Sequence, residues 1–144
     1  MIDRFIKYLV ISHMDEGESF NIIKNFFSVT YVKNDGAAFS ILSSHTFVLI
    51  ILSIAVLIYL SIYIIRNDLK KVEKISYGMI FGGILGNLYD RIIYGSVIDF
   101  LDFNLFGINW PIFNFADICI VLSMGLIIIE MVKGEMHELK SRRG

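Results

Sequence analysis

Cysteine and charged residues are scarce in this chain, and each shortage excludes a class of structure. Cys119 is the only cysteine, so no disulfide can form within the chain. Charged residues make up 19% and hydrophobic residues 56% of the 144 positions. A soluble domain of this size would have too little polar surface to cover so large an apolar interior. The composition therefore indicates a membrane protein, and the length predicts one membrane-embedded domain over 1–144.

Long apolar segments predict transmembrane helices. Residues 46–65 carry no charge, and at about 1.5 Å per residue they span about 30 Å, the thickness of a hydrocarbon core. A second uncharged stretch covers 75–89, and a third, 112–129, is interrupted only by Asp117. We predict spanning helices over 45–66, 73–93 and 113–133, and hence an all-α polytopic membrane protein with a transmembrane helix bundle.

Basic residues gather at one end of these predicted helices. They lie between the first two helices and after the third: Arg66, Lys70, Lys71, Lys74, Lys133, Lys140, Arg142 and Arg143. The loop over 94–111 contains no lysine or arginine. By the positive-inside rule, we expect 66–74 and the C-terminus to be cytoplasmic, with 12–44 and 94–111 on the outer face.

The N-terminal segment is too short to span a membrane, because its apolar part covers only residues 5–14. Three complete helices with a cytoplasmic C-terminus would leave the N-terminus outside. We therefore expect residues 1–14 to be the remnant of a first helix, shortened by a start placed too far downstream or by truncation.

Residues 20–42 have the pattern of a strand rather than a helix. Phe27, Val29 and Tyr31 recur with a period of two among β-branched residues. The Asn34-Asp35-Gly36 sequence is a strong turn signal. We predict a small β element on the outer face, packed on the membrane surface.

Charged side chains near membrane depth are costly and usually face the protein interior. Asp90, Arg91, Asp99 and Asp117 all fall near the outer ends of the last two predicted helices, which an antiparallel helix pair would bring together. Asp117 can also be an ordinary helix N-terminal carboxylate. Asp99 can be a surface-loop carboxylate, and Asp102 is its rival on the same predicted loop.

Two neighbouring carboxylates provide a chemistry for hydrolysis. They cannot both ionise cheaply, so the pair shares a proton. The ionised member can take a proton from water, and the neutral member can protonate the scissile carbonyl or the leaving amine. This chemistry needs neither a metal nor a nucleophilic side chain. Asp99 and Asp117 are the candidates for such a pair.

Other polar residues are weaker candidates. Asn87, Asp90 and Arg91 share one helix face at positions i, i+3 and i+4. Asp90 fits a buried structural role, whereas Asn87 and Arg91 can also contact a substrate backbone. We predict no metal site, because the three histidines lack ligand spacing: His13, His45 and His137.

Four segments carry a further signal: DRFIK at 3–7, VKNDGAAFS at 32–40, GGILGNLYDR at 82–91 leading into GSVIDF at 95–100, and FNFAD at 113–117. In this order they resemble one family, the prolipoprotein signal peptidases (signal peptidase II). Each segment alone is a modest signal, but the set is specific. The resemblance covers residues 3–133.

The resemblance implies a four-helix transmembrane aspartyl peptidase with an outer β cradle over 20–42 and a first helix truncated here. The family's catalytic aspartates fall on Asp99 and Asp117. Positions that shape the site or contact substrate fall on Asn34, Gly36, Asn87, Arg91 and Asn114. Structural polar positions fall on Asp3, Lys7 and Asp90. No cofactor is implied.

The implied substrate is a diacylglyceryl-modified prolipoprotein, cut just before its lipidated cysteine at the outer face of the bacterial inner membrane. We expect a monomer in contact with membrane lipids, with no nucleic-acid partner. The alternative is a non-enzymatic small transporter or assembly subunit. A transporter would place its polar groups near the bilayer midplane, whereas here they gather at one interface.

Overall fold

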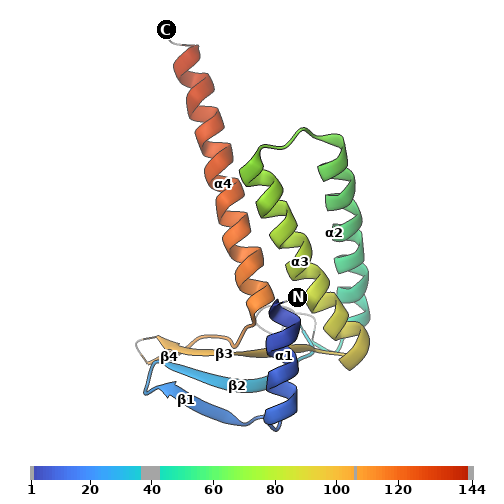
Figure 1. The fold of residues 1–144 in the computed structure, drawn as a ribbon, viewed down its shortest axis with the longest axis vertical. Helices are drawn as coiled ribbons and strands as arrows, with labels where there is room; N and C mark the ends of the chain where they lie inside the picture. The colour runs from blue at the N-terminus through green and yellow to red at the C-terminus, as the bar shows by residue number, and fades with distance from the viewer. Residues whose placement is uncertain (1, 37–42, 106, 143–144) are drawn as a thin grey trace.

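Three long helices stand side by side above a small sheet, and a short N-terminal helix lies against the sheet (Figure 1). The computed structural model describes residues 2–36, 43–105 and 107–142. In chain order the elements are α1 (Ile2–His13), β1 (Ser19–Ile23), β2 (Phe27–Asn34), α2 (Thr46–Arg66), α3 (Lys71–Tyr94), β3 (Val97–Leu105), β4 (Ile108–Asn109) and α4 (Phe115–Ser141). The sheet lies where the chain leaves α3 and enters α4.

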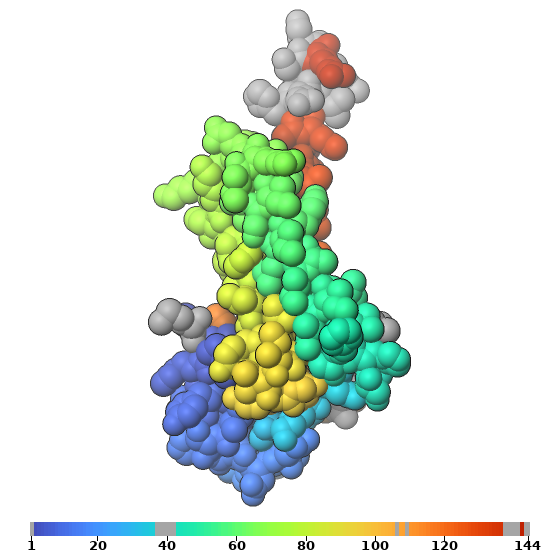
Figure 2. All heavy atoms as spheres, turned by 90° about the vertical axis from the view of Figure 1, so that its right-hand side faces the viewer, coloured from blue at the N-terminus to red at the C-terminus, as the bar shows by residue number. Residues whose placement is uncertain are grey.

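Two helices are long and apolar enough to cross a membrane, at Thr46–Arg66 and Phe115–Met136. Only 17% and 11% of these apolar windows are buried within the protein. A core helix of a soluble protein would bury its apolar residues, so these outward-facing side chains fit a lipid environment. Figure 2 shows α2 exposed along its length above the N-terminal helix and the sheet.

The third predicted span, 73–93, forms α3 but is not one of the two apolar helices. Lys71, Glu73 and Lys74 begin α3, and its buried face carries polar and small residues, including Asn87 and Asp90. These residues lower the hydropathy of α3, which packs against both α2 and α4. Whether α3 spans the membrane stays a prediction.

The sheet is larger than the β element expected from the sequence. Its strand order is β1-β2-β3-β4, and each neighbouring pair is antiparallel. Strands β1 and β2 confirm the expectation for residues 20–34, while 37–42 lie outside the described residues. The prediction of a loop over 94–111 is wrong, because residues 97–105 form β3 and pair with β2. The predicted small β element is therefore present at this end of the molecule, and it includes part of the segment expected to be a loop.

A compact apolar cluster joins the sheet to α1. Val10, Tyr31, Ile98 and Phe100 are buried together, and further α1 side chains pack against them. Residues 97–100 are all buried, so the beginning of β3 is held between the helices and α1. This cluster fixes the strand segment that carries Asp99.

Helices α3 and α4 touch closely at one glycine. A Cβ on Gly83 would lie 2.7 Å from the carbonyl oxygen of Ala116 and 2.7 Å from Cγ1 of Ile120. Real Cβ contacts are longer, so any larger residue would push the helices apart. The contact lies at the start of α4, next to Asp117.

We predict that Gly83→Ala destabilises the protein by about 1–3 kcal/mol, because its methyl group meets backbone of α4. The matched control is Gly82→Ala on the same helix, where an added Cβ meets nothing within 4 Å. Alanine favours a helix over glycine, so this control keeps or slightly raises stability. Thermal unfolding in detergent measures both variants. Equal effects at the two positions would contradict the close contact.

Candidate active site

The two candidate aspartates approach each other from different elements. Asp99 lies on β3 and pairs across the sheet with Val32 on β2. Asp117 lies in the first turn of α4. Asp99 is only 2% exposed, whereas Asp117 is partly exposed. The structure therefore joins residues from a strand and a helix that the sequence separates by the 100–116 segment.

A reciprocal cap at the start of α4 sets the position of Asp117. The Asn114 Oδ1 atom accepts the backbone N–H of Asp117 at 3.1 Å. In return, Asp117 Oδ2 accepts the backbone N–H of Asn114 at 3.1 Å. This is the geometry of a capping box, in which the first and fourth residues of the cap satisfy each other. The helix N-terminal role expected for Asp117 therefore coexists with its place beside Asp99.

Two asparagine amides hold the Asp99 carboxyl group. Asn34 Nδ2 donates to Asp99 Oδ2 at 2.9 Å, and Asn114 Nδ2 donates to Asp99 Oδ1 at 2.7 Å. The amide orientations follow from backbone donors, because Oδ1 of Asn34 accepts the N–H of Gly36 at 3.0 Å. Oδ1 of Asn114 is likewise occupied by the Asp117 N–H. Both NH₂ groups must therefore face Asp99.

Asn87 on α3 connects this pair to a buried lysine. Asn87 Nδ2 donates to Asp117 Oδ1 at 2.8 Å. Asn87 Oδ1 accepts from Asn114 Nδ2 at 3.1 Å and from Lys7 Nζ at 3.0 Å. One hydrogen-bonded network therefore joins α1, α3, β3 and α4.

Asp3, Lys7 and Asp90 form a buried charge cluster behind the network. Lys7 Nζ lies 3.0 Å from Asp3 Oδ2 and 2.7 Å from Asp90 Oδ2, and the lysine is fully buried. Arg4 pairs with the other oxygen of Asp90. A Cβ on Gly86 would lie 3.0 Å from Asp3 Oδ2, so glycine makes room for the cluster. The sequence analysis expected a structural role for Asp3, Lys7 and Asp90 but assigned no role to Arg4.

Arg91 and Gly36 lie at the edge of the site. The Arg91 guanidinium donates to the carbonyl oxygen of Gly36 at 2.8 Å. Its Nε atom is buried without a hydrogen-bond partner among the described residues. Arg91 therefore ties α3 to the end of β2 and keeps one donor uncommitted.

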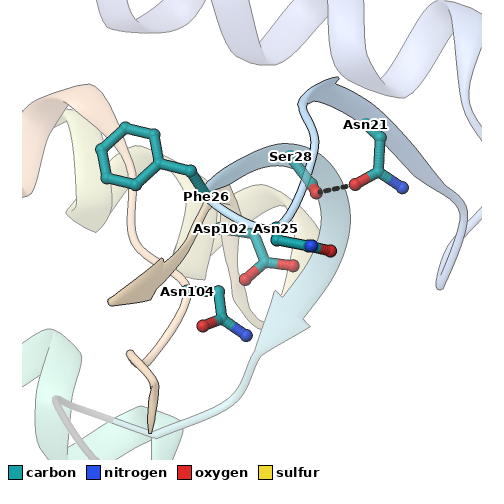
Figure 3. A pocket seen from close by; sticks show the side chains of 6 residues that line it. All are labelled: Asn21, Asn25, Phe26, Ser28, Asp102 and Asn104. Carbon is teal, nitrogen blue, oxygen red and sulfur yellow. Dashed lines mark hydrogen bonds between the residues drawn. The ribbon is translucent and has the colours of Figure 1, made fainter. Parts of the chain in front are cut away.

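Asp102, the rival of Asp99, lies apart from this network. Its Oδ2 atom accepts the Thr30 hydroxyl at 2.7 Å. It lies three residues beyond Asp99 on β3, so the two side chains point to opposite faces of the sheet. Asp102 lines a separate polar cavity of about 190 Å³ (Figure 3). The other lining residues are Asn21, Asn25, Phe26, Ser28 and Asn104.

The environment of Asp99 favours its neutral form. Burial raises the pKa of the Asp99 carboxyl to about 6, although the Asn34 hydrogen bond acts in the opposite direction. The charge of Asp117 raises the pKa further, and the Asn114 hydrogen bond and the Lys7 charge lower it. Asp99 is therefore suited to hold a proton near neutral pH. Within the described residues, no three His, Cys, Asp or Glu side chains are placed to share a metal ion.

Comparison with known proteins identifies the family of this chain. The family model described as signal peptidase (SPase) II matches residues 1–133. A lipoprotein signal peptidase of Halothermothrix orenii is 40% identical over 135 residues, which cover 94% of this chain and 90% of that protein. A lipoprotein signal peptidase of Pasteurella multocida is 40% identical over 147 residues, covering 99% and 88%.

A solved structure titled as a bacterial membrane enzyme has the same fold. It superposes with a TM-score of 0.86 at 37% identity, covering 92% of this chain and 81% of that one. A second structure with a similar title gives a TM-score of 0.83 at 37% identity, covering 92% and 86%. With the family match, these likenesses set aside the transporter and assembly-subunit alternatives. The chain is a membrane peptidase that belongs to the signal peptidase II family.

Proposed function

We propose that this peptidase removes signal peptides from diacylglyceryl-modified prolipoproteins, with Asp99 and Asp117 as its catalytic dyad. The observation that carries the assignment is the double contact of Asn114. Its side chain donates to Asp99 and its backbone N–H donates to Asp117, so one residue holds both carboxyl groups. The names of the relatives support the substrate class.

The two aspartates have different roles in the proposed mechanism. Asp99 is the more buried, and its raised pKa of about 6 suits it to carry the shared proton. Asp117 is partly exposed, so a negative charge on it loses less solvation than a charge on Asp99 would. Asp117 is therefore the general base and Asp99 the general acid.

Hydrolysis then proceeds in two balanced steps. Asp117 takes a proton from water while the water oxygen attacks the scissile carbonyl carbon, and Asp99 gives its proton to the carbonyl oxygen. The resulting diol collapses when the C–N bond breaks. Asp117 passes its proton to the leaving amine, and Asp99 recovers a proton from one hydroxyl of the diol, whose oxygen becomes the carbonyl oxygen of the product acid. The products are a carboxylic acid and an amine, and the dyad returns to its first protonation state.

The position of the dyad suits a substrate anchored in the bilayer. Asp99 and Asp117 lie at the sheet end of the helices, whereas the basic loop between α2 and α3 lies at the other end (Figure 1). The positive-inside rule then supports a cytoplasmic C-terminus and a dyad at the outer face of the bacterial inner membrane. The apolar outer surfaces of α2 and α4 suit contact with acyl chains and lipid. We propose that the chain acts there as a monomer.

We predict that Asp99→Asn or Asp117→Asn lowers the cleavage rate by at least about 10³-fold, because each variant removes one proton-transfer group. The assay follows release of the signal peptide from a diacylglyceryl-modified precursor by purified protein in lipid or detergent. Both variants are expected to insert and fold. Processing at the wild-type rate by either variant would refute the assignment.

The matched control for these variants is Asp102→Asn. It makes the same chemical change on the same strand, but on the other face of the sheet and away from Asn114. We expect cleavage within about twofold of the wild-type rate, since the residue contacts neither aspartate. Complete loss in this variant would mean that the wrong strand carboxylate has been chosen.

The raised pKa of Asp99 also predicts how stability changes with pH. An unfolded aspartate releases its proton near 3.8, whereas folded Asp99 releases it near 6. Above pH 3.8 deprotonation of this aspartate stabilises the unfolded chain, while folded Asp99 keeps its proton. The free energy of unfolding therefore falls until about pH 6. The loss attributable to Asp99 is up to about 3 kcal/mol.

Thermal unfolding of the wild type and Asp99→Asn at several pH values between 4 and 7 tests this prediction. The variant lacks the titrating group, so its melting temperature declines less steeply with rising pH than that of the wild type. Subtracting the two curves removes the contribution of the other acids. Parallel curves across this window would contradict a raised pKa for Asp99.

A further inference from the structure

Lys7 is a buried cation with three polar neighbours. A lysine ammonium group has three N–H donors and no acceptor. Three oxygen atoms lie close to Lys7 Nζ. Asp90 Oδ2 at 2.7 Å and Asp3 Oδ2 at 3.0 Å form ion pairs with it, and Asn87 Oδ1 at 3.0 Å accepts a hydrogen bond from it. Lys7 is fully buried, so these contacts replace its entire hydration.

Each of the two carboxylate partners leads to the backbone beside one dyad residue. Asp90 Oδ2 accepts the N–H of Ile98, the residue before Asp99, at 3.3 Å. Asp3 Oδ1 accepts the N–H of Ala116, the residue before Asp117, at 3.1 Å. The cluster around Lys7 therefore accepts a backbone hydrogen bond from β3 and another from α4, in each case from the residue just before a dyad aspartate.

The third partner leads directly to a dyad side chain. Asn87 Oδ1 faces Lys7 and Asn114, so its NH₂ group must face Asp117 Oδ1. If the Asn87 amide turned over, its carbonyl oxygen would face an ionised carboxylate, which is unfavourable. The cation at Lys7 makes that reversed orientation costly.

We propose that Lys7 is the positioning residue of the dyad: it sets the separation of β3 and α4 and orients Asn87 so that Asp117 stays ionised. This inference rests on the proposed function. Lys7 acts through Asn87, Asp3 and Asp90 and touches neither the dyad nor the substrate.

Several charged groups surround Asp117 besides Lys7. Asp3 comes from α1, Arg91 from α3 and Asp99 from β3, and Asp90 on α3 acts on Arg91. Arg4 pairs with the Asp90 oxygen that Lys7 does not contact. Lys7 differs from Arg4 and Arg91 in one contact. Within the part of the chain that the structure describes, it is the cation that hydrogen-bonds to Asn87.

The test compares Lys7→Met with the wild type in the prolipoprotein cleavage assay over a range of pH. Methionine keeps the length of the side chain but removes the cation. We expect the acid limb of the kcat profile to move up by about one pH unit. At acidic pH the kcat of the variant is then about tenfold lower than that of the wild type, and the difference is smaller at alkaline pH. KM should stay within about twofold, since Lys7 touches no substrate.

Arg4→Met is the matched control. It removes a cation from the same helix and the same partner, Asp90, but leaves the contact between Lys7 and Asn87 intact. Its acid limb should stay at the wild-type pH. If Lys7→Met does not fold, a double variant carrying Asp3→Asn and Lys7→Met is compared with Asp3→Asn alone. The double variant loses equal charge of each sign, and the amide that replaces the Asp3 carboxylate keeps an oxygen for the Ala116 N–H.

The outcomes separate this inference from the proposed function. An acid limb that stays in place for Lys7→Met and for the double variant, or that moves equally for Arg4→Met, overturns the role of Lys7. A uniform loss of kcat at every pH has the same consequence, because it indicates structural damage alone. If Asp117→Asn retains cleavage, the proposed function fails instead, whatever Lys7→Met does.

Discussion

The site depends on the hydrogen bonding of Asn114. Its Oδ1 atom and backbone N–H close the cap of α4 with Asp117, and its NH₂ group reaches Asp99 and Asn87. Because the cap occupies the oxygen, only the donor end of the amide is left for the partner carboxyl. The interaction that begins the helix is therefore also the one that brings a strand residue and a helix residue together.

Burial of charge makes the arrangement specific. Lys7 and Asp90 are fully buried and Asp3 is 8% exposed, and each group is paired. Removing any one of them would leave a buried charge uncompensated, which costs several kcal/mol. The close approach of α3 to α4 at Gly83 and the space beside Gly86 make this packing possible. The cluster thus links the site of the proposed dyad to the stability of the fold.

Much of the site could be predicted from local sequence, but the strand that carries Asp99 could not. The apolar runs of α2 and α4 and the period-two pattern of β2 depend on neighbours in the chain, and the structure has both. In β3, Asp99 and Asp102 interrupt an apolar segment, so the pattern resembles a loop; its partner strand lies more than sixty residues earlier. A strand depends on its cross-strand partner, which no local window contains.

The sequence by itself determined the membrane class, the family resemblance and the two candidate aspartates, because hydropathy and motif spacing are properties of the chain. Only the tertiary structure decided that Asp102 faces away from Asp99 and that Arg4 shares Asp90 with Lys7. It also decided that the NH₂ groups of three asparagines donate to the two aspartates: Asn34, Asn87 and Asn114. These depend on the pleat of β3 and on the meeting of α1, α3 and α4. Hydrogen-bond direction is settled only when donors and acceptors from distant segments lie within about 3 Å of each other.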